Sequence, residues 1–165
     1  MRDDAAGPGL KGSCLCGGIR YEIRQLLSGV VNCHCSMCRK AHGAAFRTRA
    51  TVKAAAFHFE RGEELLTFYE SSPGEFRSFC RVCGSNLITK FDRHPDVYGF
   101  PLGTLDTDPG VKPVRHVFTR DKAPWFDITD GLPQVEDIDA PTPGWGQGPL
   151  TAATPLSRSR PRRPR

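Results

Sequence analysis

The chain has 165 residues, of which 38% are hydrophobic and 25% are charged, as expected for one domain with its own hydrophobic core. Its net charge of +5 comes from residues 151–165, which hold five arginines and no acid, so residues 1–150 balance 18 basic against 18 acidic residues. A neutral body argues against a nucleic-acid-binding domain, and the lack of any apolar stretch of roughly 18 residues argues against a membrane-spanning protein.

Three parts are expected along the chain. Residues 1–11 form an N-terminal extension without the apolar segment of a signal peptide, so we expect a cytoplasmic protein. Residues 12–135 form the folded domain. Residues 136–165 are rich in Pro, Gly and Arg, lack an apolar period and predict a disordered tail. A basic tail can bind nucleic acid or another polyanion weakly, but it lacks interleaved aromatic residues that stack on bases, so a solvated extension is expected.

Apolar residues of the domain recur mainly at every second position, which predicts a mostly β fold. In GGIRYEI, residues Ile19, Tyr21 and Ile23 share one face. Similar segments follow between short Gly, Pro or polar breaks: FHFE, LLTFYE, FRSFC, NLITKF, DVYGF and VRHVFT. The segment SMCRKAHG is the exception, since Ser36 could cap a single helical turn that ends at Gly43.

All seven cysteines fall into three short clusters, which favours metal binding over disulfides in a reducing compartment. Cys14 and Cys16 form one pair, and Cys80 and Cys83 form a second. Two such pairs supply the four ligands of a structural zinc, and Gly84 provides the positive φ of a zinc-knuckle turn. A redox pair is the alternative interpretation.

The third cluster offers three ligands, Cys33, Cys35 and Cys38, the number that a catalytic zinc uses when it keeps one position open. Water, a substrate thiolate or His42 could fill the fourth position. His42 lies four residues after Cys38, on the same side of a helical turn, whereas His34 in an extended segment points to the opposite face. The spacing alone leaves the open and the closed site as alternatives.

Basic residues beside this cluster are candidates for charge compensation and substrate binding. Arg39 and Lys40 could offset the net negative charge of a zinc ion with three thiolates, and could attract substrate carboxylates. Arg47 and Arg49 could also reach a carboxylate, although a solvated strand face is the expectation for both.

Three further residues are assigned structural roles. Trp125 and Phe126 could line a substrate pocket, but core packing is expected for both. Asp106 is expected to make hydrogen bonds in a turn.

The sequence resembles the glutathione-dependent formaldehyde-activating enzyme family, which also includes centromere protein V. The segments that carry this resemblance span roughly residues 12–133, in family order: GSCLCGGIRYEI, NCHCSMCRKAHGAAF, FRSFCRVCGSNL, GTLD and KAPWFDITDGLP. The resemblance implies an Mss4-like, mostly β zinc-binding fold with two zinc ions per chain. It assigns Cys14, Cys16, Cys80 and Cys83 to a structural zinc. It assigns Cys33, Cys35 and Cys38 to a catalytic zinc, without His42 as a fixed ligand, and so favours the open site.

The resemblance also implies a carbon–sulfur lyase that joins glutathione to formaldehyde as S-hydroxymethylglutathione, or reverses that reaction. A metal-bound thiolate beside an aldehyde carbon suits this chemistry, and His42 or His34 could be the acid that protonates the product. The alternative is a noncatalytic zinc module or glutathione carrier whose basic tail binds a polyanion. An enzyme needs the three-cysteine site and should tolerate loss of residues 151–165. A binding module needs the tail, and its binding to a polyanion should weaken steeply as the salt concentration rises.

Overall fold

The computed structural model describes residues 9–25, 27 and 29–137, so most of the predicted tail, 136–165, lies outside the described residues. The strands are β1 Leu10–Ser13, β2 Arg20–Ile23, β3 Val31–Cys33, β4 Arg47–Lys53, β5 Phe57–Arg61, β6 Leu66–Ser72, β7 Glu75–Cys80, β8 Asn86–Phe91, β9 Val97–Pro101 and β10 Arg115–Val117. The helix is α1 Ser36–His42, and the short 3-10 turns are η1 Ala54–Ala56, η2 Glu63–Leu65, η3 Leu102–Thr104 and η4 Thr119–Asp121. The predicted mostly β fold is confirmed.

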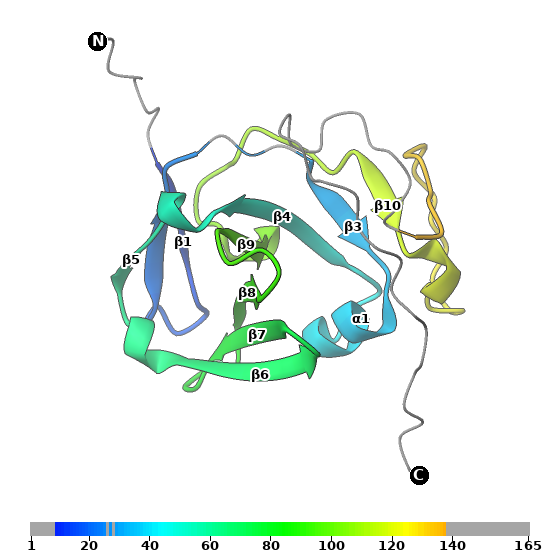
Figure 1. Cartoon of the computed structure of the whole chain (residues 1–165). Coiled ribbons are helices and arrows are strands. Elements are labelled where there is room, and N and C mark those ends of the chain that lie inside the picture. The colour runs from blue at the N-terminus through cyan, green and yellow to red at the C-terminus, as the bar shows by residue number, and fades with distance from the viewer. Residues whose placement is uncertain (1–8, 26, 28, 138–165) are drawn as a thin grey trace.

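The strands form two sheets. The smaller has the order β1-β2-β5, and the larger has the order β10-β3-β4-β9-β8-β7-β6. Figure 1 shows the larger sheet curving so that β4 faces β6 and β7 across β8 and β9, while the smaller sheet closes one side and α1 lies on the other. The β3 and β10 pair is parallel, and the other named strand pairs are antiparallel. No helix among the described residues is long and apolar enough to cross a membrane.

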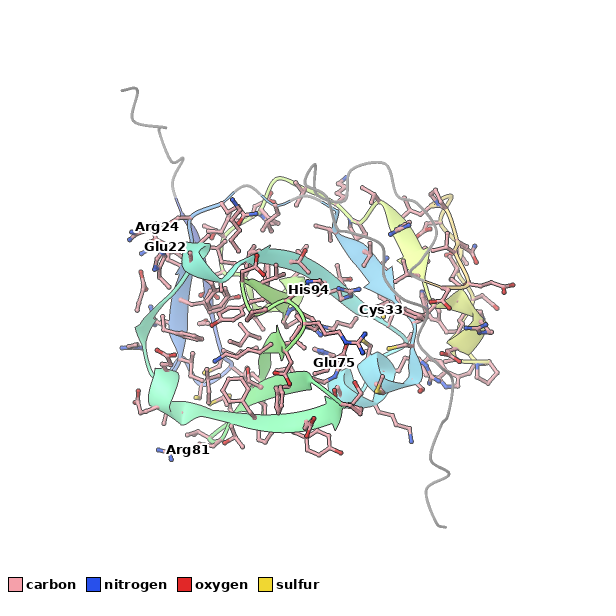
Figure 2. The ribbon with its side chains drawn as sticks, in the orientation of Figure 1. Glu22, Arg24, Cys33, Glu75, Arg81 and His94 are labelled. Atoms are coloured by element: carbon pink, nitrogen blue, oxygen red, sulfur yellow. The ribbon has the colours of Figure 1, made fainter. Side chains whose placement is uncertain are left out.

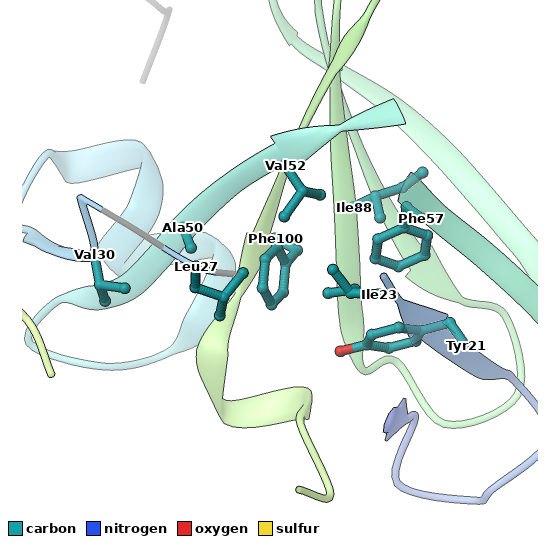
Figure 3. Close-up of a cluster of buried hydrophobic side chains, with 9 residues drawn as sticks. All are labelled: Tyr21, Ile23, Leu27, Val30, Ala50, Val52, Phe57, Ile88 and Phe100. Atoms are coloured by element: carbon teal, nitrogen blue, oxygen red, sulfur yellow. The ribbon is translucent and has the colours of Figure 1, made fainter. Parts of the chain in front are cut away.

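The main core lies between the two sheets (Figure 3). Tyr21 and Ile23 of β2 are almost fully buried against Phe57, Val52 and Phe100. The rings of Tyr21 and Phe57 stack with centroids 4.5 Å apart. Ile19 is buried as well, so the alternation predicted for this segment is confirmed, although Ile19 packs in a second cluster with Cys14, Cys80 and Leu87.

The helix α1 begins and ends close to its predicted limits, but its N-cap differs. Cys35 is the N-cap residue, and its Sγ accepts a hydrogen bond from the Cys38 backbone N–H at 3.3 Å. The expected cap, Ser36, is the first residue inside the helix. Gly43 ends the helix with φ of 58°, a conformation that glycine adopts without steric cost. Because the cap is a cysteine, the start of α1 also fixes two sulfur atoms of the three-cysteine cluster.

Candidate functional site

The structure brings together four cysteines from the start and the middle of the domain: Cys14, Cys16, Cys80 and Cys83. Their sulfur atoms all lie within 4.8 Å of one another, with Cys14 Sγ 3.5 Å from Cys16 Sγ. Cys14 and Cys16 follow β1, whereas Cys80 ends β7 and Cys83 lies in the turn after it. In that turn Gly84 has φ of 75° and donates its N–H to the Cys80 carbonyl at 2.8 Å.

The second group contains Cys33, Cys35 and Cys38, whose sulfur atoms also lie within 4.8 Å of one another. Cys33 ends β3 next to α1 (Figure 2), Cys35 caps the helix and Cys38 lies in its first turn. Cys33 and Cys38 are buried, while Cys35 is half-buried. Hydrogen bonds from the Cys33 and Cys35 thiols lower the pKa of Cys38, and the charges of Arg77 and Arg47 lower it further. These neighbours favour the thiolate form of Cys38 over its thiol form.

Both groups fit a tetrahedral metal ion with thiolate ligands. All seven cysteines are free thiols. Two sulfur–sulfur distances in the four-cysteine group are 3.5 and 4.0 Å, much longer than a disulfide bond of about 2.05 Å. They lie on either side of roughly 3.8 Å, the distance between two sulfur ligands of a tetrahedral zinc ion. Sets of three or four thiolates, with no carboxylate in either group, suit a soft ion such as zinc. Each group could hold one metal ion.

His42 does not join the second group, which among the described residues consists of the three cysteines. It lies at the last position of α1 and is half-buried. Burial lowers the pKa of His42 to about 4, and the positive charge of Arg47 contributes to this shift. His42 is therefore neutral at pH 7 and lies beside the cluster rather than in its ligand set.

Two arginines lie next to the second group: Arg47, expected on a solvated strand face, and Arg77, which the sequence does not single out. Arg47 is the cross-strand partner of Cys33 and is only 5% exposed, so the expectation of a solvated strand face is wrong for it. Arg77 of β7 donates from Nη1 toward Cys38 Sγ at 3.8 Å. By contrast, Arg39 donates from Nε to the His34 carbonyl, and Lys40 is exposed. Arg77 and Arg47 are therefore the cations whose charges act on Cys38, while the predicted role of Arg39 and Lys40 in charge compensation stays a prediction.

His34 lies outside the sulfur group and takes part in a buried hydrogen-bond chain. Its Nε2 is 2.7 Å from His116 Nδ1, and His116 Nε2 is 3.1 Å from both carboxylate oxygens of Asp130. If His116 donates from Nε2 to Asp130, its Nδ1 accepts a hydrogen bond from His34 Nε2. Burial, reinforced by the charge of His116, lowers the pKa of His34 to about 4, in agreement with a neutral ring.

The aromatic residues near this chain differ in burial. Phe126 packs with its ring centroid 5.5 Å from Phe46 and 6.0 Å from His34, as expected for core packing. Trp125 is 70% exposed, so the expectation of core packing is wrong for it. Asp106 accepts from the Ser13 hydroxyl at 3.0 Å and so links distant segments rather than closing a local turn.

A cleft of about 560 Å³ lies between the end of α1, the turn after β7 and the end of β9. Its lining is Ala41, His42, Gly43, Cys83, Gly84, Ser85, Asn86, Pro101, Gly103 and Thr104. Asn86 ties two of its walls together by donating from Nδ2 to the Ala41 carbonyl at 2.8 Å. His42 and Asn86 also line a small hollow beside Arg47 and Arg77. The cysteine that lines the cleft itself is Cys83 of the four-cysteine group, and none of Cys33, Cys35 and Cys38 does.

One of the comparisons with known proteins identifies a family. The sequence profile of the glutathione-dependent formaldehyde-activating enzyme matches residues 9–121. Among solved structures, the chain is similar to a crystal structure of a Rhodobacter sphaeroides protein, with 29% sequence identity and a TM-score of 0.52. That match covers 76% of this chain and 99% of the other chain. No curated protein matches the chain.

Proposed function

Because the chain belongs to the glutathione-dependent formaldehyde-activating enzyme family, we propose that it is a carbon–sulfur lyase acting on a glutathione–aldehyde adduct. In the forward direction the sulfur of glutathione bonds to the carbonyl carbon of formaldehyde. The thiol loses its proton, and the carbonyl oxygen gains one, so S-hydroxymethylglutathione forms without an oxidant or a reductant. The reverse reaction breaks the same carbon–sulfur bond.

The observation that carries the proposal is the difference between the two cysteine groups. Four sulfur atoms complete a tetrahedral set, whereas Cys33, Cys35 and Cys38 leave one position for a further ligand. We assign one zinc ion to each group, two per chain. A zinc ion held by Cys33, Cys35 and Cys38 would act as a Lewis acid that lowers the pKa of a thiol beside it.

The cleft supports a substrate larger than a simple thiol. Its volume of about 560 Å³ lies in the range of small-molecule sites, and its lining holds no Lys, Arg, Asp or Glu side chain. Backbone groups at Gly43, Gly84 and Gly103 are accessible there, since a Cβ at any of the three would meet no atom within 4 Å. Such a surface suits the peptide groups of glutathione.

The histidines do not suit the role of general acid. His42 and His34 both have a pKa of about 4, so only about one molecule in a thousand carries the extra proton at pH 7. His34 is also fully buried. Neutral His42 has one N–H to donate as a hydrogen bond to the adduct oxygen, and we expect water to supply the transferred proton.

The test measures the exchange of glutathione and formaldehyde with their adduct by NMR, because the uncatalysed exchange gives a baseline in the same tube. We expect the exchange rate to rise in proportion to zinc-loaded protein and to stay at baseline with Cys38→Ser. Binding of glutathione without faster exchange would instead indicate a carrier. A protein that loses 151–165 should keep full activity, and loss of activity on that truncation would contradict the proposal.

A further inference from the structure

Arg47 and Arg77 approach the three-cysteine group from two different strands. Arg47 of β4 lies opposite Cys33 in the antiparallel register with β3, so both side chains share one face of the sheet. Arg77 of β7 lies opposite Thr89 of β8, and Thr89 Oγ1 accepts a hydrogen bond from Arg47 Nη1 at 3.2 Å. Arg77 Nη1 lies 3.8 Å from Cys38 Sγ. The sheet therefore places two guanidinium groups beside the sulfur atoms.

Arg47 is a buried charge with few partners of its own. It is 5% exposed, and its Nε has no hydrogen-bond partner in the described part of the chain. The hollow that it shares with Arg77 is lined by no acidic residue. Glu75 lies 3.9 Å from Arg77 Nη2, at the outer side, with a side chain that is 38% exposed. A buried charge without a partner is strongly unfavourable, so negative charge at the cysteine group is what stabilises Arg47.

The number of charges indicates what the site accepts. Three thiolates with one divalent cation carry a net charge of minus one, and two arginines more than balance it. A neutral ligand at the fourth position leaves this positive excess in a buried region, whereas an anionic ligand removes it. Glu75, being partly exposed, is screened by solvent and compensates weakly.

We propose that Arg47 and Arg77 make the open position of the three-cysteine site selective for an anionic ligand atom, such as a thiolate sulfur, over a neutral one. This inference rests on the proposed function, since it concerns the same site. The two arginines are positioning residues that act through charge on the ligand atom itself. They do not bind the carboxylates of glutathione, so any thiol that binds as a thiolate benefits equally.

The test compares ligand affinities of zinc-loaded, full-length variants by calorimetry. The probes are glutathione, 2-mercaptoethanol as a thiol without carboxylates, and imidazole as a neutral metal ligand. At the dielectric response typical of protein sites, removing one nearby charge is expected to weaken anion binding about tenfold or more. We therefore expect Arg47→Gln to lower the affinity for both thiols by this factor and to leave the affinity for imidazole unchanged. Arg47→Lys should retain most of the thiol affinity.

A matched control and a second variant keep the result interpretable. Arg115 is equally buried, at 4% exposed, but it lies opposite Val31 of β3, whereas Arg47 lies opposite Cys33. Arg115→Gln should leave both thiol affinities unchanged. Arg77→Gln repeats the test at a side chain that is 12% exposed, if Arg47→Gln does not fold.

The outcomes separate the inference from the proposed function. Equal loss of thiol and imidazole affinity would mean that Arg47 only supports the fold, and loss confined to glutathione would mean that it binds a carboxylate; either overturns the inference. Wild-type affinities retained in both arginine variants would overturn it too, while leaving the lyase function intact. Selective thiol binding without faster adduct exchange would support the inference and count against the lyase.

Discussion

Replacing Gly103 by Phe tests whether the cleft beside His42 holds the substrate. Gly103 lines the cleft, its φ is not in the left-handed region, and a Cβ there would meet no atom within 4 Å. A side chain can therefore be added without backbone strain or a clash. Gly131 offers the same freedom outside the cleft, so Gly131→Phe is the matched control.

The size of the effect follows from the volume that the ring removes. Seven carbon atoms at roughly 30 Å³ each occupy about 200 Å³, by analogy with the volume of a water molecule. This is more than a third of the cleft of about 560 Å³. If the ring costs glutathione even about 60 Å² of apolar contact, the loss is about 1.5 kcal/mol, or roughly tenfold in affinity.

The assay is the NMR exchange measurement with two thiols. We expect Gly103→Phe to raise the KM for glutathione at least tenfold and to leave exchange with 2-mercaptoethanol unchanged, because the smaller thiol needs only the sulfur position. Gly131→Phe should behave as wild type with both. Unchanged kinetics with glutathione, or equal loss with both thiols, would refute the assignment of the cleft to the substrate.

Three further predictions concern the metal groups and the core. Cys38→Ser should lower the zinc content from two ions per chain to one and abolish exchange while leaving the circular dichroism spectrum unchanged; an unfolded variant would mean that this zinc is structural. Cys14→Ser should instead lower the thermal midpoint sharply, because Cys14 joins the segment after β1 to the turn after β7, and an unchanged midpoint would contradict a structural role. Tyr21→Phe removes the hydrogen bond that the Tyr21 hydroxyl donates to Thr104 at 2.7 Å, which should cost about 1 kcal/mol of unfolding free energy at pH 7 in a denaturant titration. Burial raises the pKa of the Tyr21 hydroxyl well above its ordinary value of 10.0, so the contribution of this group to stability is fully present below pH 10 and is lost as the pH rises above 10, by about 1.4 kcal/mol per pH unit. The wild-type and Tyr21→Phe stabilities should therefore converge and cross near about pH 11, and parallel curves would refute this assignment.

The sequence was most informative where the pattern is local. Alternation predicted the buried face of Ile19, Tyr21 and Ile23, because residues two apart in a strand share a face regardless of what packs on them. Cysteine spacing predicted which sulfur atoms gather, since a pair separated by one or two residues already lies close in a turn. The limits of α1 followed from Gly43, although the cap turned out to be Cys35 rather than Ser36.

The surroundings of the site depend on long-range pairing that no local pattern reveals. Arg77 reaches Cys38 only because β7 packs near α1, and its sequence context, FRSFC, resembles any half-buried strand. The pairing of Cys33 with Arg47 depends on the register between β3 and β4, which the sequence does not specify. His34 and His116 are 82 residues apart in the sequence, and His116 and Asp130 are 14 residues apart. Nothing in the sequence therefore indicates that these three side chains form one hydrogen-bond chain.

The most direct test of the open three-cysteine site is the zinc content per chain, followed by X-ray absorption at the zinc edge with and without saturating glutathione. We expect two zinc ions per chain and an average sulfur coordination that rises from about 3.5 toward 4 when glutathione is added. Two zinc ions with unchanged sulfur coordination would contradict this account, because the protein itself or water would then keep the fourth position.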